Sequence, residues 1–387
     1  MSFRSTCAAL ALIGVLTAAA CGGNGTVPPS QAAAAFGAAS SVSDVAPLAD
    51  HTSILKKFKK DVIIGSTVDS GNGDAGPHSI SIVQSTYGLK KGQLVACNFA
   101  DSNGNAGKGT TVEVLDPKAG SKPSTFVQSN AIEGCTGATT TLENEVCAAG
   151  YAAAEIVCFD RTGSVLNTYG SPIKAPFSDE DAHCIPGPRC LYGAELIFGS
   201  DAKTGGIVDF SINDIGNPNP TEVATGFAVN NKSGWSALGP SGLSYNANKL
   251  GTLYVTDGIN NTVVALTNAS DLLAKDEVVV LKGGKTFKCK YHGNGAPCGR
   301  LIFAGSPLNE PVGMTMLPNG NLVVANSQGG NTLVEIDVST GKVLATKVVD
   351  TSKTQGVFAL AAIGSKDSNT ALYYTDTNDN SVHELEQ

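Results

Sequence analysis

One unit of about 50 residues recurs six times along this chain, and the repeat constrains the fold more than any other feature. Its clearest copy, Leu317–Thr346, reads LPNGNLVVANSQGGNTLVEIDVSTGKVLAT. NLVVANS and TLVEIDV alternate apolar and polar residues, QGGN and STGK are turn sequences, and VLATKVV continues as a further strand. The preceding EPVGMTMLPNG adds a strand and its turn. The unit therefore predicts a small sheet of four antiparallel strands.

The other copies keep the same order of strand, turn and strand. They occupy Gly92–Pro117, Glu143–Gly163, Ala194–Asp214, Gly251–Ser270 and Thr370–Gln387. With Leu94, Glu145, Leu196, Leu253, Leu322 and Leu372 taken as equivalent, the steps between units are 51, 51, 57, 69 and 50 residues. Repeats of this size predict a radial or stacked array in which each sheet buries its faces on its neighbours. We expect an all-β fold, a six-bladed β-propeller with four-stranded antiparallel blades.

The two ends of the chain suggest how such a ring closes. The last unit stops at Gln387, after its third strand, so one strand is missing there. Near the other end ILKKFKKDVIIGSTV, Ile54–Val68, is a strand-like segment that belongs to no unit. We predict that this N-terminal segment completes the sixth blade, which leaves no sheet edge unpaired.

Composition agrees with this fold and limits the classes of binding partner that we expect. Charged residues make up only 16% of the chain and Gly numbers 45, as suits many short strands and tight turns. The formal net charge of −8 disfavours electrostatic binding to nucleic acid or anionic lipid. We expect a monomer that contacts a membrane only through a lipid anchor.

The N-terminus, MSFRSTCAALALIGVLTAAACGGNG, has the layout of a secretory signal peptide. Its apolar run of 13 residues, Ala8–Ala20, is too short to span a bilayer. The sequence AAAC, Ala18–Cys21, resembles a bacterial lipobox, which predicts lipidation of Cys21. Ordinary signal peptidase would cut the same bond and leave Cys21 without lipid. We predict a signal peptide at 1–20, a flexible tether at 21–50 and the propeller at 51–387. The protein is expected to be exported, either lipid-anchored in the bacterial cell envelope or periplasmic or secreted.

Ten cysteines fall to eight once Cys7 leaves with the signal peptide and Cys21 is assigned to lipid. An even number in an exported chain suggests disulfides. Spacing favours local pairs of Cys184 with Cys190 and of Cys289 with Cys298. For the other four we favour Cys97 with Cys135 and Cys147 with Cys158, although four cysteines allow three connectivities.

Two stretches of the repeat resemble known families. GPSGLSYNANKLGTLYVTDGINNTVVAL resembles an NHL repeat, and NLVVANSQGGNTLVEIDVSTGKVLATKVV resembles the related YVTN repeat of bacterial cell-surface propellers. The resemblance covers most of residues 54–387 and is weak in unit two, where Glu145 occupies the apolar position. It implies a six-bladed propeller but no single activity, because the same architecture hosts lactonases, lyases, quinoprotein-like enzymes and binding modules.

Two inserts, Ser171–Cys190 and Lys282–Asn309, break the period. By family analogy, we expect each to join a fourth strand to the next first strand, on the face around the channel mouth. The first contains Asp179, Glu180 and Asp181, and the second contains four lysines and one arginine. We interpret them as solvated loops that pair weakly. The alternative is a rim that recognises an anionic or polar ligand.

Histidines offer further candidates near this mouth. His183 and His292 lie in the inserts, and His78 begins the first strand of the first unit. Histidines at a propeller mouth bind metal in some relatives, but these three have no fixed spacing. We keep them as ligand-binding candidates and predict no cofactor, with calcium or another divalent metal as the alternative.

Polar residues also close the second strand of most units. They are Asn98, Ser200, Asp257, Asn326 and Asp376, with Ala149 in unit two. Asn and Asp side chains there accept backbone N–H bonds in the following turn, so we interpret them as turn caps. As the alternative, Asp257, Asn326 and Asp376 are ligand candidates at the channel mouth. Asp101, Asn103 and Asn105 supply oxygens in the spacing of a calcium loop, but Val112 stands where its closing acid belongs.

These observations favour a non-catalytic binding or scaffold propeller of the cell envelope, which presents one face to a protein, a glycan or a small ligand. The alternative is a lactonase-like hydrolase or lyase that uses a metal at the channel mouth. Its first candidates are His78, His183, Asp257, Asn326 and Asp376.

Overall fold

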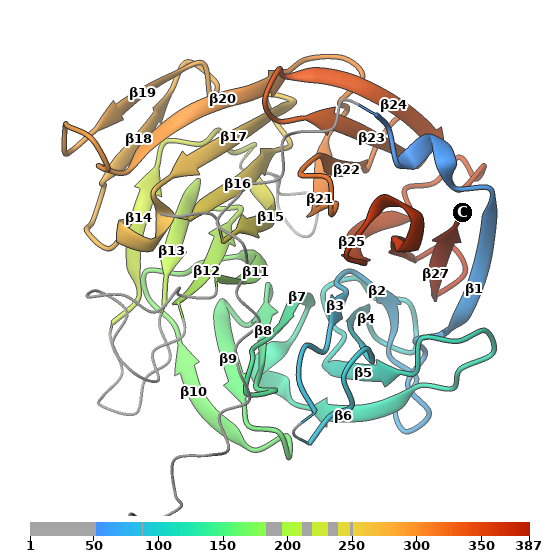
Figure 1. Cartoon of the computed structure of the whole chain (residues 1–387). Coiled ribbons are helices and arrows are strands. Elements are labelled where there is room, and N and C mark those ends of the chain that lie inside the picture. The colour runs from blue at the N-terminus through green and yellow to red at the C-terminus, as the bar shows by residue number, and fades with distance from the viewer. Residues whose placement is uncertain (1–51, 87, 183–195, 211–218, 231–238, 248–250) are drawn as a thin grey trace, which may run out of the picture. The chain divides into compact units, whose positions relative to one another are not determined.

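Six sheets stand around a central axis in the computed structural model of the chain (Figure 1). The structure describes residues 52–86, 88–182, 196–210, 219–230, 239–247 and 251–387. All of these belong to one unit, Asp44–Gln387. The predicted signal peptide and the whole predicted tether, with Cys21, lie outside the described residues.

The six sheets are the predicted blades. Blade one contains β2 (Ala75–Pro77), β3 (Ser81–Ile82), β4 (Leu94–Ala100), β5 (Thr111–Leu115) and β6 (Ser124–Gln128). Blade two contains β7 (Cys135–Thr140), β8 (Val146–Gly150), β9 (Glu155–Phe159) and β10 (Val165–Tyr169). Blade three contains β11 (Pro176–Ala182), β12 (Leu196–Asp201), β13 (Gly206–Asp209), β14 (Thr221–Thr225), β18 (Val278–Leu281) and β19 (Thr286–Cys289). Blade four contains β15 (Pro240–Asn246), β16 (Thr252–Asp257), β17 (Thr262–Thr267) and β20 (Cys298–Ala304). Blade five contains β21 (Pro311–Met316), β22 (Leu322–Asn326), β23 (Thr332–Asp337) and β24 (Lys342–Val348). Blade six contains β25 (Val357–Ile363), β26 (Ala371–Asp376), β27 (Ser381–Glu386) and β1 (Lys60–Ser66).

Helices are short throughout the described ranges. They are the 3₁₀ turns η1 (Leu55–Lys57), η2 (Asn130–Ile132), η4 (Ala269–Asp271) and η5 (Asp367–Asn369). Within those ranges no helix combines the length and the apolarity that crossing a membrane would take.

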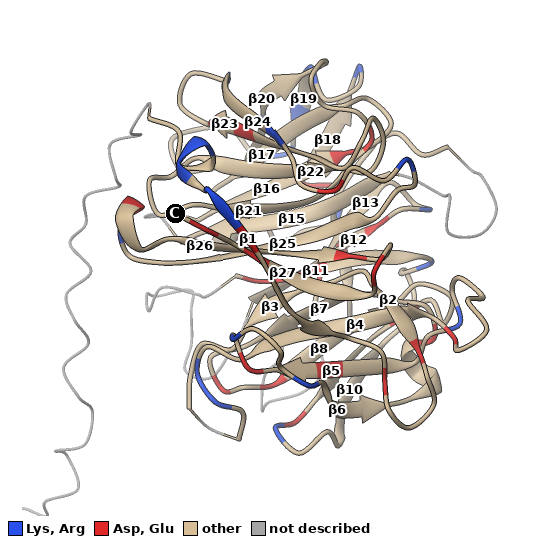
Figure 2. Ribbon diagram, turned by 90° about the vertical axis from the view of Figure 1, so that its right-hand side faces the viewer, with Lys and Arg blue, Asp and Glu red and all other residues tan. Residues whose placement is uncertain are grey.

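Side-chain alternation in the strands produces a separate core between each pair of neighbouring blades. In β4, Val95 and Cys97 pack toward blade two, whereas Leu94 and Ala96 pack toward blade six. Successive side chains of a strand point to opposite faces, so a strand inside the ring buries both sets. Charged residues gather mostly in the connections, as Figure 2 shows. The predicted radial array is confirmed.

The N-terminal segment closes the ring, as predicted. β1 pairs antiparallel with β27, with Lys60 opposite Glu386 and Ser66 opposite Ser381. Just before β1 the chain packs into the core between blades five and six. There the buried Glu335 carboxylate accepts the backbone N–H groups of Ile54 and Leu55 at 3.1 and 2.9 Å. The closing segment is therefore held by a strand ladder and by a buried anchor.

Three of the four predicted disulfides are confirmed. Cys97–Cys135 links blades one and two, Cys147–Cys158 crosses β8 and β9, and Cys289–Cys298 ties β19 to β20. Cys184 and Cys190 fall outside the described residues.

The second insert lies elsewhere than the sequence suggested. β20 is the fourth strand of blade four, so Lys282–Asn309 begins between the third and fourth strands of that blade and not between two blades. The hairpin β18–β19 instead extends blade three, because β18 pairs parallel with β14. It covers an outer edge that would otherwise be unpaired (Figure 1).

The first insert is also different from the prediction of a solvated loop. Pro176–Ala182, which contains its acidic run, is β11, the innermost strand of blade three. β11 pairs with β12 along its length. Ser171–Ala175 precede β11, and residues 183–190 of the insert, with His183, lie outside the described residues.

The assumed equivalence of the units is one residue off in blades two and three. Asp201 pairs with Pro176 and Gly206, just as Asp257 pairs with Pro240 and Thr262. The apolar anchors of these blades are therefore Val146 and Ile197, and not Glu145 and Leu196. This shift removes the anomaly of a glutamate at an apolar position.

Candidate ligand site in the central channel

The innermost strands of the six blades line a channel along the ring axis. Their equivalent positions by register are Pro77, the last residue of β2, and the first residues of the other five inner strands: Cys135, Pro176, Pro240, Pro311 and Val357. Two residues later the side chain is always small: Ser79, Gly137, Ser178, Gly242, Gly313 and Ala359. A Cβ on Gly313 would overlap the carbonyl oxygen of Phe358 on the next inner strand. Small residues are needed because neighbouring backbones meet at this level.

One end of the channel is closed by an apolar plug. We define the plug as Phe177, Ala202, Val312 and Phe358, with Tyr151 and Ile259 packed against them. His78 joins it, with its ring 3.8 Å from that of Phe358 and 4.3 Å from that of Phe99. Blades one to six all contribute. The plug lies where the turns between second and third strands begin, so the predicted mouth on that face is filled by side chains.

His78 is a packing residue of this plug. Burial lowers the pKa of its imidazole to about 4, although the hydrogen bond to the Gly76 carbonyl opposes the shift. The neutral ring then donates from Nδ1 to that carbonyl oxygen at 3.0 Å. His78 therefore carries no charge at neutral pH.

Two cavities lie along the channel. One of about 60 Å³ touches the plug residues His78, Phe177 and Phe358. The other, of about 200 Å³, lies where the inner strands end, among Glu180, Asp181, Tyr245, Met314 and Met316. Several wall residues are shared by both, so the channel widens away from the plug.

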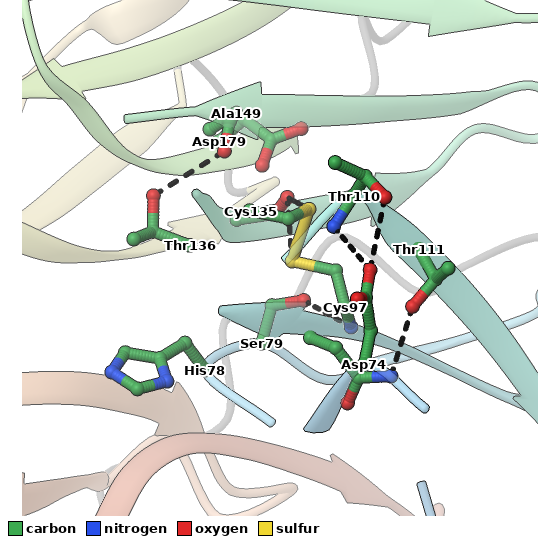
Figure 3. Close-up of a disulfide and its surroundings, with 12 residues drawn as sticks. Asp74, His78, Ser79, Cys97, Thr110, Thr111, Cys135, Thr136, Ala149 and Asp179 are labelled. Carbon is green, nitrogen blue, oxygen red and sulfur yellow. Dashed lines mark hydrogen bonds between the residues drawn. A yellow bond between two sulfur atoms is a disulfide. The ribbon is translucent and has the colours of Figure 1, made fainter. Parts of the chain in front are cut away.

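Asp179 is the exception among the residues that line this channel. The corresponding residues of the other inner strands are aliphatic or methionine: Ile80, Ala138, Leu243, Met314 and Leu360. Asp179 is 5% exposed and lines the smaller cavity. Figure 3 shows Asp179 together with Thr136 of β7 and with His78, which lies between β2 and β3.

The carboxyl of Asp179 is poorly satisfied. Oδ2 accepts the backbone N–H of Thr139 at 3.3 Å, and Oδ1 has no hydrogen-bond partner among the described residues. Burial raises the pKa of Asp179 well above its usual range, and the neighbouring Glu180 adds to the shift. A buried carboxyl of this kind is costly to the fold and marks a candidate functional residue.

The next two residues of β11 are also acidic. Glu180 Oε1 accepts the backbone N–H of Tyr245 at 2.9 Å, and the backbone N–H of Asp181 donates to Thr139 Oγ1 at 3.1 Å. Burial, with Asp181 nearby, raises the pKa of the Tyr245 hydroxyl to about 12. Among the described residues that line the two cavities there is no lysine or arginine. The described lining residues of the two cavities therefore include acidic side chains and no lysine or arginine.

The residues at the ends of the second strands mostly stabilise turns and connections. Asp257 Oδ1 accepts the N–H groups of Ile259 and Asn260 at 2.9 and 3.0 Å, and Asp376 Oδ1 accepts that of Asn378 at 2.8 Å. These two confirm the prediction of turn caps.

The other members of that set bind neighbouring segments instead of their own turns. Asn326 accepts the N–H of Asn309 at 2.9 Å and donates to the Pro307 carbonyl at 2.8 Å. Asn98 donates to the carbonyl of Thr67, and Ser200 donates to that of Ser241. In blade three the turn cap is Asp201, one residue further on.

The candidate calcium loop forms a closed turn. Asp101 Oδ1 accepts the N–H groups of Asn103 and Asn105, both at 2.9 Å, and Oδ2 accepts the Asn105 amide at 2.8 Å. These bonds lower the pKa of Asp101. Asn103 and Asn105 are exposed, and Asp101 is half-buried. His292 is exposed too, in the connection between β19 and β20 on the outer side of the ring, away from the channel.

One group of possible metal ligands occurs among the described residues, in blade six. It consists of Asp376, Asp379 and His383, whose ligand atoms lie within 4.8 Å of one another. His383 is held by Asp379 at 2.9 Å and by Asp61 of β1 at 3.1 Å, and it stacks on Tyr374. Burial opposes protonation of His383, but the two carboxylates outweigh it and raise its pKa. The group thereby ties the closing strand to its neighbour.

Comparisons with known proteins agree with the architecture. No family model and no curated protein matches the chain. A catalytically inactive virginiamycin B lyase from Staphylococcus aureus with quinupristin is similar at 16% identity and TM-score 0.50, over 84% of this chain and 89% of that one. A gluconolactonase from Xanthomonas campestris is similar at 12% identity and TM-score 0.51, over 85% of this chain and 98% of that one. The chain is a six-bladed propeller. At these identities the likeness shows the fold alone.

Proposed function

We propose that this protein is a non-catalytic binding propeller of the cell envelope that takes a small ligand in its central channel. The ligand enters from the end away from the apolar plug, where the larger cavity lies. The observation that carries the proposal is Asp179, a buried carboxyl at a position where every other blade has an apolar residue.

The fold gains one long hydrogen bond from that carboxyl, donated by the Thr139 N–H. Folding a chain with a buried, half-satisfied carboxyl costs about 1–3 kcal/mol compared with a satisfied or apolar group. Five blades avoid this cost at the same level of the channel, so the propeller itself does not require an acid there. A ligand that donates to Asp179 would explain why blade three retains it.

The compartment is inferred from covalent chemistry and from the N-terminus. Three disulfides indicate an oxidising location outside the cytoplasm. The lipobox-like sequence at Cys21 supports attachment to the envelope by lipid, and a periplasmic or secreted form is the alternative.

The sequence candidates for a metal-dependent hydrolase or lyase do not gather at one place. His78 belongs to the plug, Asp257 and Asp376 cap turns, and Asn326 holds a connection. His183 lies outside the described residues. The channel cavities therefore support binding better than they support that chemistry.

Methionine methyl groups provide a direct test of channel binding. The chain has three methionines, Met1, Met314 and Met316, and the last two line the larger cavity. In protein labelled with ¹³C at the methionine methyls, a small-molecule library should contain ligands that shift the Met314 and Met316 signals saturably. The same ligands should fail with Asp179→Leu. Two results would contradict the proposal: a library in which no compound shifts either methionine signal, or compounds that shift the signals equally in the wild type and in Asp179→Leu.

A further inference from the structure

His383 is an imidazole at a position where four other blades have valine. It pairs with Tyr374, two residues before the end of the second strand of blade six. The residues at the equivalent place are Val157, Val208, Val264 and Val334, with Glu113 in blade one. The propeller itself therefore does not require a histidine there, although His383 is only 9% exposed.

The imidazole of His383 is held in one orientation by two other side chains. Nδ1 lies 3.1 Å from Oδ1 of Asp61 in β1, and the Tyr374 hydroxyl donates to the same carboxylate at 2.6 Å. The Tyr374 ring also stacks on the imidazole, with 4.7 Å between the ring centroids. Metal-bound histidines almost always donate their other N–H to a carboxylate or a similar acceptor, which fixes the ring and raises its basicity as a ligand. Asp61 therefore prepares Nε2 of His383 to bind a metal ion.

Two carboxylates meet that second nitrogen. Asp379 Oδ2 lies 2.9 Å from Nε2, and an oxygen of Asp376 completes three ligand atoms within 4.8 Å of one another. A tetrahedral zinc ion with bonds of about 2.1 Å holds its ligands about 3.4 Å apart. Asp379 lies in the turn before β27 with its side chain 43% exposed, so it can move by the half ångström or so that this geometry needs.

The negative charge of this group exceeds what one protonated histidine can balance. No lysine or arginine pairs with Asp61, Asp376 or Asp379 within the part of the chain that the structure describes. Burial and the neighbouring carboxylates of Asp350 and Asp379 raise the pKa of Asp376. A divalent cation would balance this charge better than a single proton does.

The donor atoms distinguish between metals. One imidazole nitrogen and two carboxylate oxygens suit zinc and related transition metals, whereas calcium takes six to eight oxygen ligands. Three protein ligands next to a half-exposed turn leave the fourth position of a tetrahedral zinc ion to water.

We propose that blade six carries a zinc site, in which His383 Nε2 and the carboxylates of Asp376 and Asp379 are the ligands and Asp61 positions the imidazole. None of these residues lines either channel cavity, so the site is independent of the proposed channel ligand. Because Asp61 belongs to β1, bound zinc also strengthens the closure of the ring.

The test measures zinc binding to tag-free protein by calorimetry and replaces zinc by cobalt to detect tetrahedral coordination in the visible spectrum. We expect one zinc ion per chain and a Tm that rises with zinc concentration, because a ligand of the folded state stabilises it. Asp379→Asn should weaken zinc binding about tenfold or more, and His383→Gln provides a second variant if the first folds poorly. Asp61→Asn should weaken binding by about 10–100-fold without changing the stoichiometry.

Asp101 provides a matched control, since it occupies the equivalent turn position of blade one. Asp101→Asn should bind zinc as the wild type does. Three results would overturn the zinc site: no stoichiometric binding, equal affinity in Asp379→Asn and the wild type, or calcium binding at least as tight as zinc binding. Wild-type affinity in Asp61→Asn would overturn the positioning role of Asp61.

Discussion

Replacing Asp179 with leucine should stabilise the propeller at pH 7 while it abolishes ligand binding. Leucine has the branching of aspartate with methyl groups in place of the two oxygens, and the other blades carry apolar residues at this level. Removing the half-satisfied carboxyl should gain about 1–3 kcal/mol. Oδ1 lies close to Gly137, so the new methyl is crowded there and about 1 kcal/mol of the gain is lost. Leucine also leaves the buried Thr139 N–H without the Asp179 acceptor, which costs about 1 kcal/mol or more. While the carboxyl is protonated, these effects roughly cancel and the net change in stability is within about 1 kcal/mol of zero.

The gain should grow with pH. Burial raises the pKa of Asp179 well above the 3.8 of an unfolded chain, so the folded state keeps a proton that the unfolded state has lost. The wild type therefore loses stability as pH rises from 3.8 toward the folded pKa, by up to about 1.4 kcal/mol per pH unit. Asp179→Leu lacks this dependence.

Urea denaturation followed by circular dichroism at pH 4 and pH 7 measures both effects. We expect the free energy of unfolding of Asp179→Leu to be close to that of the wild type at pH 4 and to exceed it at pH 7. Met314→Leu, a change of similar volume at the equivalent position, should alter stability by less than about 1.5 kcal/mol. An Asp179→Leu variant that is destabilised at pH 7, or a difference that does not change with pH, would refute the reasoning that this carboxyl is retained for function.

Three further predictions concern the fold. Deletion of residues 51–68 should prevent cooperative unfolding in circular dichroism, because β1 and the anchored segment before it are lost, whereas deletion of 22–45 should leave the midpoint unchanged. Burial raises the pKa of Glu113 to about 8, so the wild type should lose stability between pH 4.5 and 8; Glu113→Gln should lack that loss in urea melts at pH 6 and pH 9. Gly313→Ala should lower stability by about 2 kcal/mol or more, since its Cβ would overlap a backbone carbonyl, while Gly170→Ala, with nothing within 4 Å, should be neutral in the same thermal melts.

The blades could be predicted from the sequence because their signals are local. Alternation within a strand and the turn residues between strands both lie within one unit, so six sheets and their order followed from the chain. The closing strand could be predicted by counting strands, since the sixth blade was one strand short and the strand-like segment Ile54–Val68 belonged to no blade. The disulfides Cys97–Cys135, Cys147–Cys158 and Cys289–Cys298 followed from proximity in sequence.

The errors arose where the pattern was ambiguous or long-range. Leu196 and Ile197 are adjacent and both buried, so either could be taken as the anchor of its strand, and the wrong choice shifted the turn cap from Asp201 to Ser200. The pairing of β18 with β14 joins segments about 50 residues apart and has no local signature.

The site was missed because its acidic run looked like solvent-exposed chain. Acidic residues are seldom fully buried, and PFSDEDA was therefore interpreted as a loop. A signal was present in the common start of the inner strands, GPHSISI, PFSDED, GPSGLSY and EPVGMTM. When these segments are aligned on their prolines, Asp179 occupies the same position as Ile80, Leu243 and Met314. It is the one acidic residue among these four. The plug needed the structure, because each blade supplies only one or two of its residues.

A crystal structure of the protein with a ligand found in the methionine-methyl screen tests the central claim most directly. We predict density for that ligand in the channel, in contact with Asp179 and with Met314. The plug of Phe177, Val312 and Phe358 should stay closed. Density for the ligand only on the plug face, or a channel without ligand density at a saturating concentration, would contradict the account.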